Sequence, residues 1–341
     1  MLEKFCNIFG VSGDEERITS AVVEEIKASG AMYEYMKNGN LIVYKKGRKE
    51  PDAKLMICAH TDEVGFIVTD ITNEGYLKFD CVGGIDDRIL PAKRIFIGEN
   101  KIPGVIGLKA IHLTDKDERE KPVKFSDMYI DIGAGSKEDA MNYVSIGDYG
   151  YFEKFYVSNS KRHISKALDD RAGVTLLTRL IKEECEYSFV ACFNVMEEIG
   201  MKGAFTSARK INPDYAIILE GTTCSDIGGT PPNLRSTVLG DGPAISIRDF
   251  GAHSDREFNN YIIELAQRKG IKYQLKRTHR GGNDSAAVQL AGNGVKSAAI
   301  SVPVRYIHSP AGIMDEQDFE NAGKLLKEII NELGALKKGN E

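Results

Sequence analysis

Residues 54–63 read KLMICAHTDE, an apolar run that ends abruptly in polar side chains. Short apolar runs bounded by polar residues are typical of strands buried on both faces, as in parallel sheets. Here the run is followed at once by His60, Thr61, Asp62 and Glu63. In open α/β sheets, ligands bind beyond the carboxyl ends of the strands. This stretch therefore predicts a central strand of an α/β fold with a functional site at its end.

The second half of the chain repeats this pattern of apolar strands and amphipathic helices. Helices are expected at 168–183, 257–268 and 318–333, and strands at 189–196, 215–219 and 296–301. Strands that alternate with helices predict a mixed, mainly parallel sheet sandwiched by helices. At the N-terminus, Ser12 and Glu15 have the spacing of a capping box, and the apolar positions from Ile18 to Ile26 predict a helix.

Residues 64–160 have a different pattern. Short β-like segments such as 65–68, 76–81 and 94–97 are separated by turns that contain Gly, Asn and Asp, without a long helical period. We therefore expect a small β-barrel-like domain at residues 64–160. It would be inserted into a discontinuous α/β domain made of residues 1–63 and 161–341.

The composition argues against several classes of protein. The 341 residues carry 45 Lys and Arg against 50 Asp and Glu, a net charge of −5, unlike a general nucleic-acid binder. No apolar run approaches the roughly 20 residues of a membrane span, and the first ten residues lack a signal-peptide core. The six cysteines form no CxxC pair, which fits reduced thiols. We expect a cytoplasmic protein with neither nucleic acid nor a membrane as partner.

Acidic and imidazole side chains recur at five places, at the ends of predicted strands or at a helix start. They are His60 with Asp62, Asp169 in ALDDRAG, Glu197 with Glu198 in MEEIG, Glu220 in LEG, and His308 in YIHSP. Taken singly, each has an ordinary explanation: a surface histidine, a capped helix N-terminus or a solvated strand end. Taken together, they supply two imidazoles and several carboxylates, the mixed ligands that suit Zn²⁺, Mn²⁺ or Co²⁺.

Such a set of ligands predicts a hydrolytic centre. Two cations that share a carboxylate lower the pKa of a bridging water, and an adjacent Glu can accept its proton, which allows amide hydrolysis. The sequence contains no HExxH, which excludes the helix-borne zinc-protease geometry, and GxSxG is also absent.

In this order and spacing, the segments AHTDEVGF, ALDDRAG, MEEIGMKGA, LEGTT and RYIHSP resemble those of a known family. It is the family of cytosolic dinuclear metallo-aminopeptidases that assemble as tetrahedral dodecamers, which includes glutamyl aminopeptidases and proteins labelled as endoglucanases. The resemblance spans nearly the whole chain. It implies a zinc exopeptidase-like α/β fold whose inserted β domain carries contacts of a homo-oligomer, a dodecamer.

The resemblance also implies roles for individual residues. It implies two divalent metal ions, with Zn²⁺ expected and Co²⁺ or Mn²⁺ as alternatives. Glu197 would be the general base, Asp62 would orient His60, and the Asp169–Asp170 peptide would be cis. The implied ligand sets are His60, Asp169 and Glu220 for one ion, and Asp169, Glu198 and His308 for the other. The chain departs from the family pattern at Glu220, where many members carry Asp, and at 282–285 (GNDS), where Gly-Thr-Asp is usual.

The expected function is removal of the N-terminal residue from peptides with a free N-terminus. A hydroxide that bridges the two metal ions would attack, and Glu197 would take its proton. Three alternatives stay open: an endoglucanase-type glycoside hydrolase, a dipeptidase or N-acyl amino acid deacylase with the same metal site, and a metal-binding scaffold without turnover. Glycoside hydrolysis needs two carboxyl groups roughly 5–9.5 Å apart around a sugar, whereas Glu197 and Glu198 are adjacent in sequence.

Overall fold

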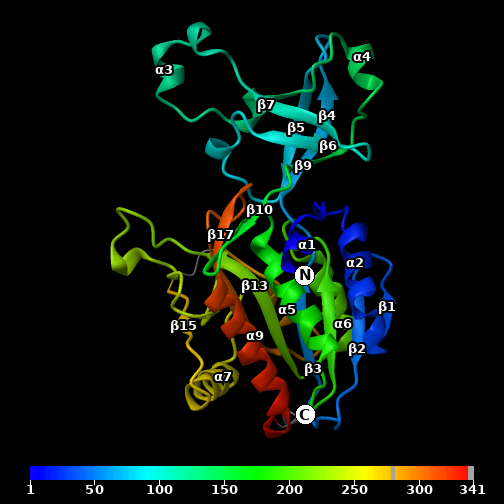
Figure 1. The fold of residues 1–341 in the computed structure, drawn as a ribbon, viewed down its shortest axis with the longest axis vertical. Coiled ribbons are helices and arrows are strands. Elements are labelled where there is room, and N and C mark those ends of the chain that lie inside the picture. The colour runs from blue at the N-terminus through cyan, green and yellow to red at the C-terminus, as the bar shows by residue number, and fades with distance from the viewer. Residues whose placement is uncertain (278–280, 337–341) are drawn as a thin grey trace.

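The computed structural model describes residues 1–277 and 281–336, and within this part of the chain eleven strands form one mixed sheet (Figure 1). Its centre consists of four parallel strands, in the order β12 (Phe189–Asn194), β3 (Leu55–His60), β13 (Tyr215–Thr223) and β16 (Lys296–Arg305). The expected α/β fold with a mixed sheet is confirmed. Its centre is parallel, but the sheet as a whole has more antiparallel than parallel strand pairs, so it is less parallel than predicted.

Antiparallel strands extend the sheet on both sides of this centre. Next to β12 lie β2 (Leu41–Lys45) and then β1 (Met32–Tyr35). Next to β16 lie β17 (Gly312–Asp315), β11 (Arg162–Ser165) and β10 (Tyr156–Ser158). The short strand β14 (Ala244–Ile245) also pairs with β16 and is itself paired with β15 (Gln274–Leu275).

Helices pack on both faces of the sheet and form two apolar cores. The larger core contains α1 (Leu2–Cys6), α2 (Glu16–Ile26), α5 (Leu168–Lys182), α7 (Arg256–Arg268) and α9 (Glu316–Asn331), and the smaller one contains α6 (Lys202–Ile211) and α8 (Ser285–Val288). Leu55, Ile57 and Ala59 of β3 point into the larger core, whereas Met56 and Cys58 point into the smaller one. Because successive strand residues alternate between faces, both sides of β3 must be apolar, which explains the uninterrupted run.

The inserted segment forms a separate closed barrel of six antiparallel strands, drawn above the sheet in Figure 1. Its strands are β4 (Gly65–Ile71), β5 (Leu77–Val82), β6 (Arg94–Ile97), β7 (Ile102–Gly107), β8 (Tyr129–Asp131) and β9 (Tyr149–Phe152), and two short helices accompany them, α3 (Lys116–Arg119) and α4 (Lys137–Met141). The barrel has its own core, in which the ring of Phe66 makes edge contacts with Phe79 and Phe152. The predicted inserted barrel is therefore confirmed.

The start of α2 differs from the sequence-based prediction. The helix begins at Glu16, and Glu15 at its N-cap makes no capping hydrogen bond with its side chain, so the predicted capping box of Ser12 and Glu15 is wrong. Both side chains are buried and form other hydrogen bonds: Ser12 donates to Asp62, and Glu15 accepts from the backbone N–H of Met196. The helix therefore depends on its buried apolar face rather than on a cap.

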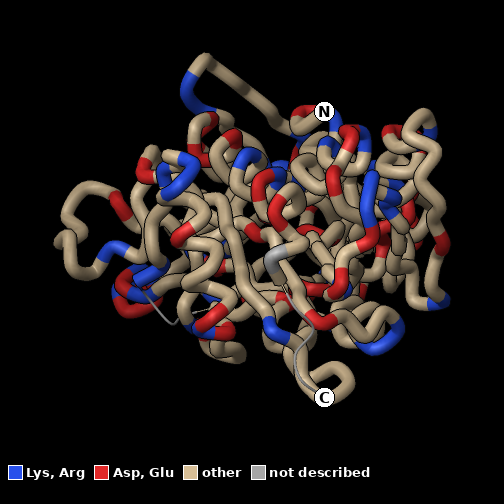
Figure 2. Tube along the Cα trace, turned by 90° about the horizontal axis from the view of Figure 1, so that it is seen from below, with Lys and Arg blue, Asp and Glu red and all other residues tan. Residues whose placement is uncertain are grey.

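Charged residues of both signs are spread over the view of Figure 2. One group of them joins three helices, because Glu25 of α2 contacts Lys4 of α1 at 2.7 Å and Lys182 of α5 at 2.9 Å. The hydrogen bonds from these lysines lower the pKa of Glu25 to about 2. Among the residues that the structure describes, no helix has both the length and the apolar character needed to cross a membrane.

Candidate metal centre

The residues singled out in the sequence come together at one edge of the sheet. Because β12, β3, β13 and β16 run parallel, their carboxyl ends lie at the same edge. His60 ends β3 and Glu220 lies in β13, while Glu197 and Glu198 follow β12, His308 follows β16 and Asp169 lies at the start of α5. Contacts of 3.3–3.5 Å link the five residues predicted as metal ligands in one cluster.

The first half of the cluster is centred on His60, whose side chain is only 1% exposed. Its Nε2 lies 3.3 Å from Oδ1 of Asp169 and 3.5 Å from Oε2 of Glu220. The second half is centred on His308, whose Nε2 lies 3.4 Å from Oδ2 of Asp169 and 3.3 Å from Oε1 of Glu198. Asp169 therefore presents one carboxylate oxygen to each imidazole.

The backbone around Asp169 brings its carboxylate close to β13. The Asp169–Asp170 peptide is cis, as the resemblance implied. Oδ1 of Asp169 accepts a hydrogen bond of 2.9 Å from the backbone N–H of Gly221. A Cβ atom at position 221 would lie 2.8 Å from that oxygen, so the close approach requires glycine. Gly221 directly follows Glu220. Strand β13 therefore supplies Glu220 as a candidate ligand and, at Gly221, the space that the carboxylate of Asp169 occupies.

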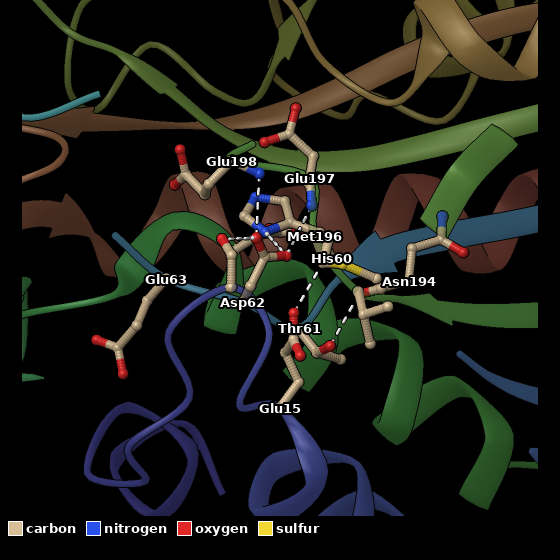
Figure 3. A network of polar contacts seen from close by, with 12 residues as sticks. Glu15, His60, Thr61, Asp62, Glu63, Asn194, Met196, Glu197 and Glu198 are labelled. Atoms are coloured by element: carbon tan, nitrogen blue, oxygen red, sulfur yellow. Dashed lines mark hydrogen bonds and ion pairs between the residues drawn. The ribbon is translucent and has the colours of Figure 1, made fainter. Parts of the chain in front are cut away.

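Asp62 lies between His60 and the backbone of Glu197 and Glu198 (Figure 3). Its Oδ1 accepts a hydrogen bond from the N–H of Glu197 and its Oδ2 accepts one from the N–H of Glu198, both at 3.0 Å. Oδ1 also lies 3.4 Å from Nδ1 of His60, an ion-pair distance rather than a hydrogen bond. Burial raises the pKa of Asp62, but its contacts with His60 and Ser12 outweigh this and keep that pKa below its usual value.

The turn after β12 separates the two neighbouring glutamates. Met196 has a φ of +56°, in the left-handed region that non-glycine residues rarely adopt. Figure 3 shows the side chains of Glu197 and Glu198 leaving this turn in different directions. Glu198 reaches His308, whereas the carboxylate of Glu197 points away from that of Glu198.

Burial and like charge raise the pKa of the glutamates in the centre. Burial, followed by the charge of Glu220, raises the pKa of Glu197 well above its usual value. Burial also raises the pKa of Glu220 strongly and that of Glu198 to about 7. It opposes the charged form of the histidines, but nearby carboxylates outweigh it and raise the pKa of His60 and, to about 9, that of His308. These acidic groups need protons or cations to balance their charge.

The donor atoms are spaced as expected for ligands of a divalent cation. The four N–O distances of the cluster are 3.3–3.5 Å, and ligand atoms bound about 2.0 Å from a tetrahedral Zn²⁺ lie roughly 3.3 Å apart. Among the described residues, Oε1 of Glu220 and Oδ2 of Asp170 are buried without a hydrogen-bond partner. Donor atoms of His60, Asp170 and Glu220 lie within 4.8 Å of one another, as do those of His60, Asp169 and Glu198. These residues fit divalent cations held by nitrogen and oxygen.

Sequence reasoning missed several groups around the centre. The sequence predicts Ser12 and Glu15 as a helix cap, whereas they contact Asp62 and Met196, and it assigns no role to Asp170, whose carboxylate lies near His60 and Glu220. Nδ1 of His308 contacts the backbone carbonyl oxygen of Gly84 at 2.8 Å, although Gly84 follows β5 of the barrel. The pair of glycines at 83 and 84 is a local signal for a close backbone approach, but it does not indicate the partner.

Comparison with known proteins identifies the family. Residues 39–325 match the family model described as M42 glutamyl aminopeptidase. The chain belongs to this family. It is therefore an aminopeptidase, a hydrolase of peptide bonds, as the resemblance implied. Membership of this metallopeptidase family implies a divalent metal ion, and the donor set described above fits one.

Two curated relatives and three solved structures resemble this M42 aminopeptidase over nearly its whole length. It is 40% identical to a provisionally named aminopeptidase of Acetivibrio thermocellus over 97% of both chains. It is 30% identical to the lysyl aminopeptidase of Pyrococcus furiosus, over 98% of this chain and 96% of the relative. An aminopeptidase of the archaeon Desulfurococcus kamchatkensis has a TM-score of 0.93 at 32% identity, with 99% and 97% of the two chains covered.

The two other solved structures relate to assembly and to naming. The TET1 peptidase of Pyrococcus horikoshii, described as able to assemble into a tetrahedron or a large octahedral shell, has a TM-score of 0.85 at 36% identity, covering 97% of this chain and 98% of that chain. A Thermotoga maritima protein named endoglucanase has a TM-score of 0.80 at 34% identity, covering 97% of both chains. The M42 aminopeptidase therefore has relatives under both names, as the resemblance implied.

Proposed function

We propose that this M42 aminopeptidase removes the N-terminal residue of peptides with a free N-terminus, using two divalent metal ions and Glu197 as general base. Zn²⁺ is the expected ion, with Co²⁺ or Mn²⁺ as alternatives, because nitrogen and oxygen ligands accept several divalent metals. The proposed ligands are His60, Asp169 and Glu220 for one ion, and Asp169, Glu198 and His308 for the other.

The position of Asp169 between two imidazoles carries this proposal. Its two carboxylate oxygens face Nε2 of His60 and Nε2 of His308, at 3.3 and 3.4 Å. Each imidazole has a further carboxylate beside it, so the cluster divides into two sets of three donors that share one residue. Oδ1 of the neighbouring Asp170 accepts a hydrogen bond from the N–H of Gly173, which favours Asp169 as the shared ligand.

The chemistry would then divide between the cations and the chain. Divalent cations bound here would lower the pKa of a coordinated water and polarise the scissile carbonyl. Glu197 is fixed through its backbone N–H on Asp62, and its side chain points away from Glu198 (Figure 3). It is therefore available to accept a proton from the water and to pass it to the nitrogen of the leaving amine. The carboxylates of the cluster would also attract the protonated α-amine of the substrate.

Replacing Glu197 by Gln tests the proposed general base. The variant keeps the size of the side chain and the backbone hydrogen bond to Asp62, but it removes the group that accepts the proton. We expect kcat to fall by about 10²–10⁴-fold, with two ions per chain retained. Turnover of aminoacyl-p-nitroanilides and metal content by mass spectrometry are the measurements.

The matched control for this variant is Glu74→Gln, an exposed glutamate in a barrel turn. It should hydrolyse the same substrates at the wild-type rate. Near-normal turnover by Glu197→Gln with its metal content intact would exclude Glu197 as the general base.

Substrate panels separate the proposal from its alternatives. An aminopeptidase should cleave aminoacyl-p-nitroanilides and reject N-terminally blocked peptides, whereas an N-acyl amino acid deacylase should accept blocked substrates and a dipeptidase should accept only dipeptides. Carboxymethylcellulose tests the glycoside hydrolase that the endoglucanase name suggests. A chelator should abolish the peptidase activity, and adding back Zn²⁺, Co²⁺ or Mn²⁺ separately identifies the metals that restore it. A metal-binding scaffold would show no turnover in any of these assays.

We further propose that the inserted domain, residues 64–160, carries the contacts of a homo-oligomer and that the assembly is a dodecamer. The supporting observation is a set of exposed apolar side chains on this domain, Val105, Ile111, Leu113, Met141 and Ile146. Light scattering on the purified protein should give the mass of twelve chains, and a monomer would contradict the proposal. We also propose a cytoplasmic location, which the six free cysteines support.

A further inference from the structure

The N-terminal segment before α2 lies between the barrel and the turn that carries Glu197 and Glu198. Gly13 approaches the barrel so closely that a Cβ atom there would lie 2.3 Å from the hydroxyl oxygen of Tyr149. Asp14 accepts a hydrogen bond of 2.5 Å from the hydroxyl group of Tyr151, also on β9. Gly13 and Asp14 thus contact the barrel. The side chains of Ser12 and Glu15 point the other way, toward the candidate metal centre.

Ser12 and Glu15 contact the turn at two points. The hydroxyl group of Ser12 donates a hydrogen bond of 2.6 Å to Oδ2 of Asp62, the oxygen that also accepts from the N–H of Glu198. Oε1 of Glu15 accepts hydrogen bonds from the N–H groups of Gly13 at 2.8 Å and Met196 at 2.9 Å. Glu15 thereby ties the N-terminal segment directly to the first residue of the turn.

Three consecutive backbone N–H groups of the turn are therefore held by two buried carboxylates (Figure 3). The N–H of Met196 donates to Glu15, and those of Glu197 and Glu198 donate to Asp62. Successive N–H groups that converge on anions define the backbone conformation of a turn closely. Because Met196 has a left-handed φ of +56°, a conformation that costs about 1 kcal/mol or more, the turn needs such contacts to persist.

We propose that Glu15 is a positioning residue for the reaction: it holds the Met196 turn so that Glu197 points toward the reacting water and Glu198 toward His308. Ser12 supports the same turn through Asp62. This inference rests on the proposed function, in which Glu197 is the general base. The hydrogen bonds of the Glu15 side chain go to the backbone N–H groups of Gly13 and Met196 rather than to His60 or His308. Its effect is therefore transmitted through the backbone of the turn.

Burial of the Glu15 carboxyl group costs free energy, because the group leaves water. Its side chain is buried and does not cap α2. Burial, followed by the nearby charge of Asp62, raises its pKa to about 7, so the carboxyl is held there against its preference for water. The acceptor atom Oε1, rather than the negative charge, makes the two contacts. A neutral side chain of the same shape should therefore serve as well.

Glu15→Ala and Glu15→Gln test this inference, with Glu16→Ala as the matched control. Glu16 is the neighbouring glutamate, exposed on the first turn of α2. We expect kcat of Glu15→Ala to fall by about 10–100-fold, because a displacement of about 1 Å of a catalytic group can cost that much. KM should change less than about twofold. Glu15→Gln should keep kcat within about threefold of the wild type, and Glu16→Ala should match the wild type.

The visible absorption spectrum of the Co²⁺-substituted protein provides a readout that does not depend on turnover. Glu15→Ala should alter the absorption bands because Glu198 moves, and Glu15→Gln should restore them. Unchanged kcat and spectrum in Glu15→Ala would overturn the inference, as would a Gln variant that is as impaired as the Ala variant. If Glu15→Ala does not fold, Ser12→Ala decides: a lower kcat with an altered spectrum supports the proposal that Ser12 and Glu15 hold the Met196 turn, and no change in either overturns it. Failure of the proposed function itself would appear separately, as a wild-type protein that cleaves no peptide.

Discussion

His60 and His308 face the same carboxylate, but the protein holds them in different ways. His60 ends the central strand β3, is 1% exposed, and has the carboxylate of Asp62 on its far side at 3.4 Å. His308 lies in a loop after β16, has a φ of +56°, and is 32% exposed. Its Nδ1 contacts the carbonyl oxygen of Gly84, which belongs to the inserted domain.

The difference shows that the two halves of the centre have different structural origins. The half around His60 is built by strands β3 and β13 and the start of helix α5, all outside the inserted barrel. In the other half, Gly84 orients His308, and a Cβ atom at Gly83 would lie 3.2 Å from Cβ of Glu198. Groups that contact a metal ligand from behind tune its orientation and its affinity for the metal. The half around His308 should therefore depend on the position of the barrel, and the half around His60 should not.

Replacing each histidine by Ala should give the largest contrast. His60→Ala removes a fully buried partner of Asp169 and Glu220, and leaving their charges unpaired should cost roughly 3 kcal/mol of unfolding free energy or more. His308→Ala should cost about 1 kcal/mol or less, because this side chain is partly exposed. Activity should be lost in both. Calorimetry of the metal-free proteins measures the difference.

Metal content distinguishes the two halves in the same pair of variants. His308→Ala should keep the ion of the His60 half, whereas His60→Ala should disturb the shared ligand Asp169 and reduce binding at both positions. Equal stability and equal metal content in the two variants would contradict the asymmetry.

The role of the barrel is tested by Gly83→Ala against Gly133→Ala. Both glycines lie in the inserted domain with similar φ angles, +83° and +78°, so both substitutions add similar backbone strain. At Gly83 the new Cβ would lie 2.8 Å from Val64 and 3.2 Å from Glu198, whereas at Gly133 it meets none of the described residues within 4 Å. We expect Gly83→Ala to lower the binding affinity for one of the two ions by about 10-fold or more.

Titration of the apo protein with Zn²⁺ in a calorimeter measures this effect. Gly133→Ala should bind both ions as the wild type does. If the two variants bind metal equally, the barrel does not support the His308 half, and the contact with Gly84 is only structural.

The location of the centre could be predicted because it depends on one property of the sheet. Parallel strands bring their carboxyl ends to one edge, so polar residues that follow apolar runs, such as His60 and Glu220, must meet there. The apolar run of residues 54–59 defines its strand without help from the rest of the chain. The strand β3 ends at His60, two residues before Asp62, and the carboxylate of Asp62 still lies beside the His60 ring.

The supports of the centre could not be predicted in this way. Ser12 and Glu15 have the spacing of a capping box, and only the folded chain shows that Ser12 donates to Asp62 and that Glu15 accepts from the N–H of Met196. The contact between Gly84 and His308 joins residues 224 positions apart in sequence. No local pattern specifies such a pair, because a backbone carbonyl carries no sequence signal.

The smallest expected effect is a pH dependence of the metal-free protein. Neighbouring carboxylates raise the pKa of His308 from 6.5 to about 9 despite its burial. Between these values the folded chain binds more protons than the unfolded chain, so the unfolding free energy of the apo protein should fall as the pH rises. Burial raises the pKa of Glu198 to about 7, which acts with the same sign at lower pH. With cations bound, the ligands are deprotonated and the decline should disappear.

Thermal unfolding between pH 6 and 9, with and without metal, measures this dependence, and His308→Ala separates the two halves. In the apo variant the decline between pH 6.5 and 9 should be weaker than in the apo wild type, by about 2 °C in Tm. His60 also has a raised pKa, so part of the decline should remain in the variant. If the apo wild type instead becomes more stable as the pH rises, the imidazole of His308 is not paired with Asp169 and Glu198, and the contrast between the two halves loses its electrostatic basis.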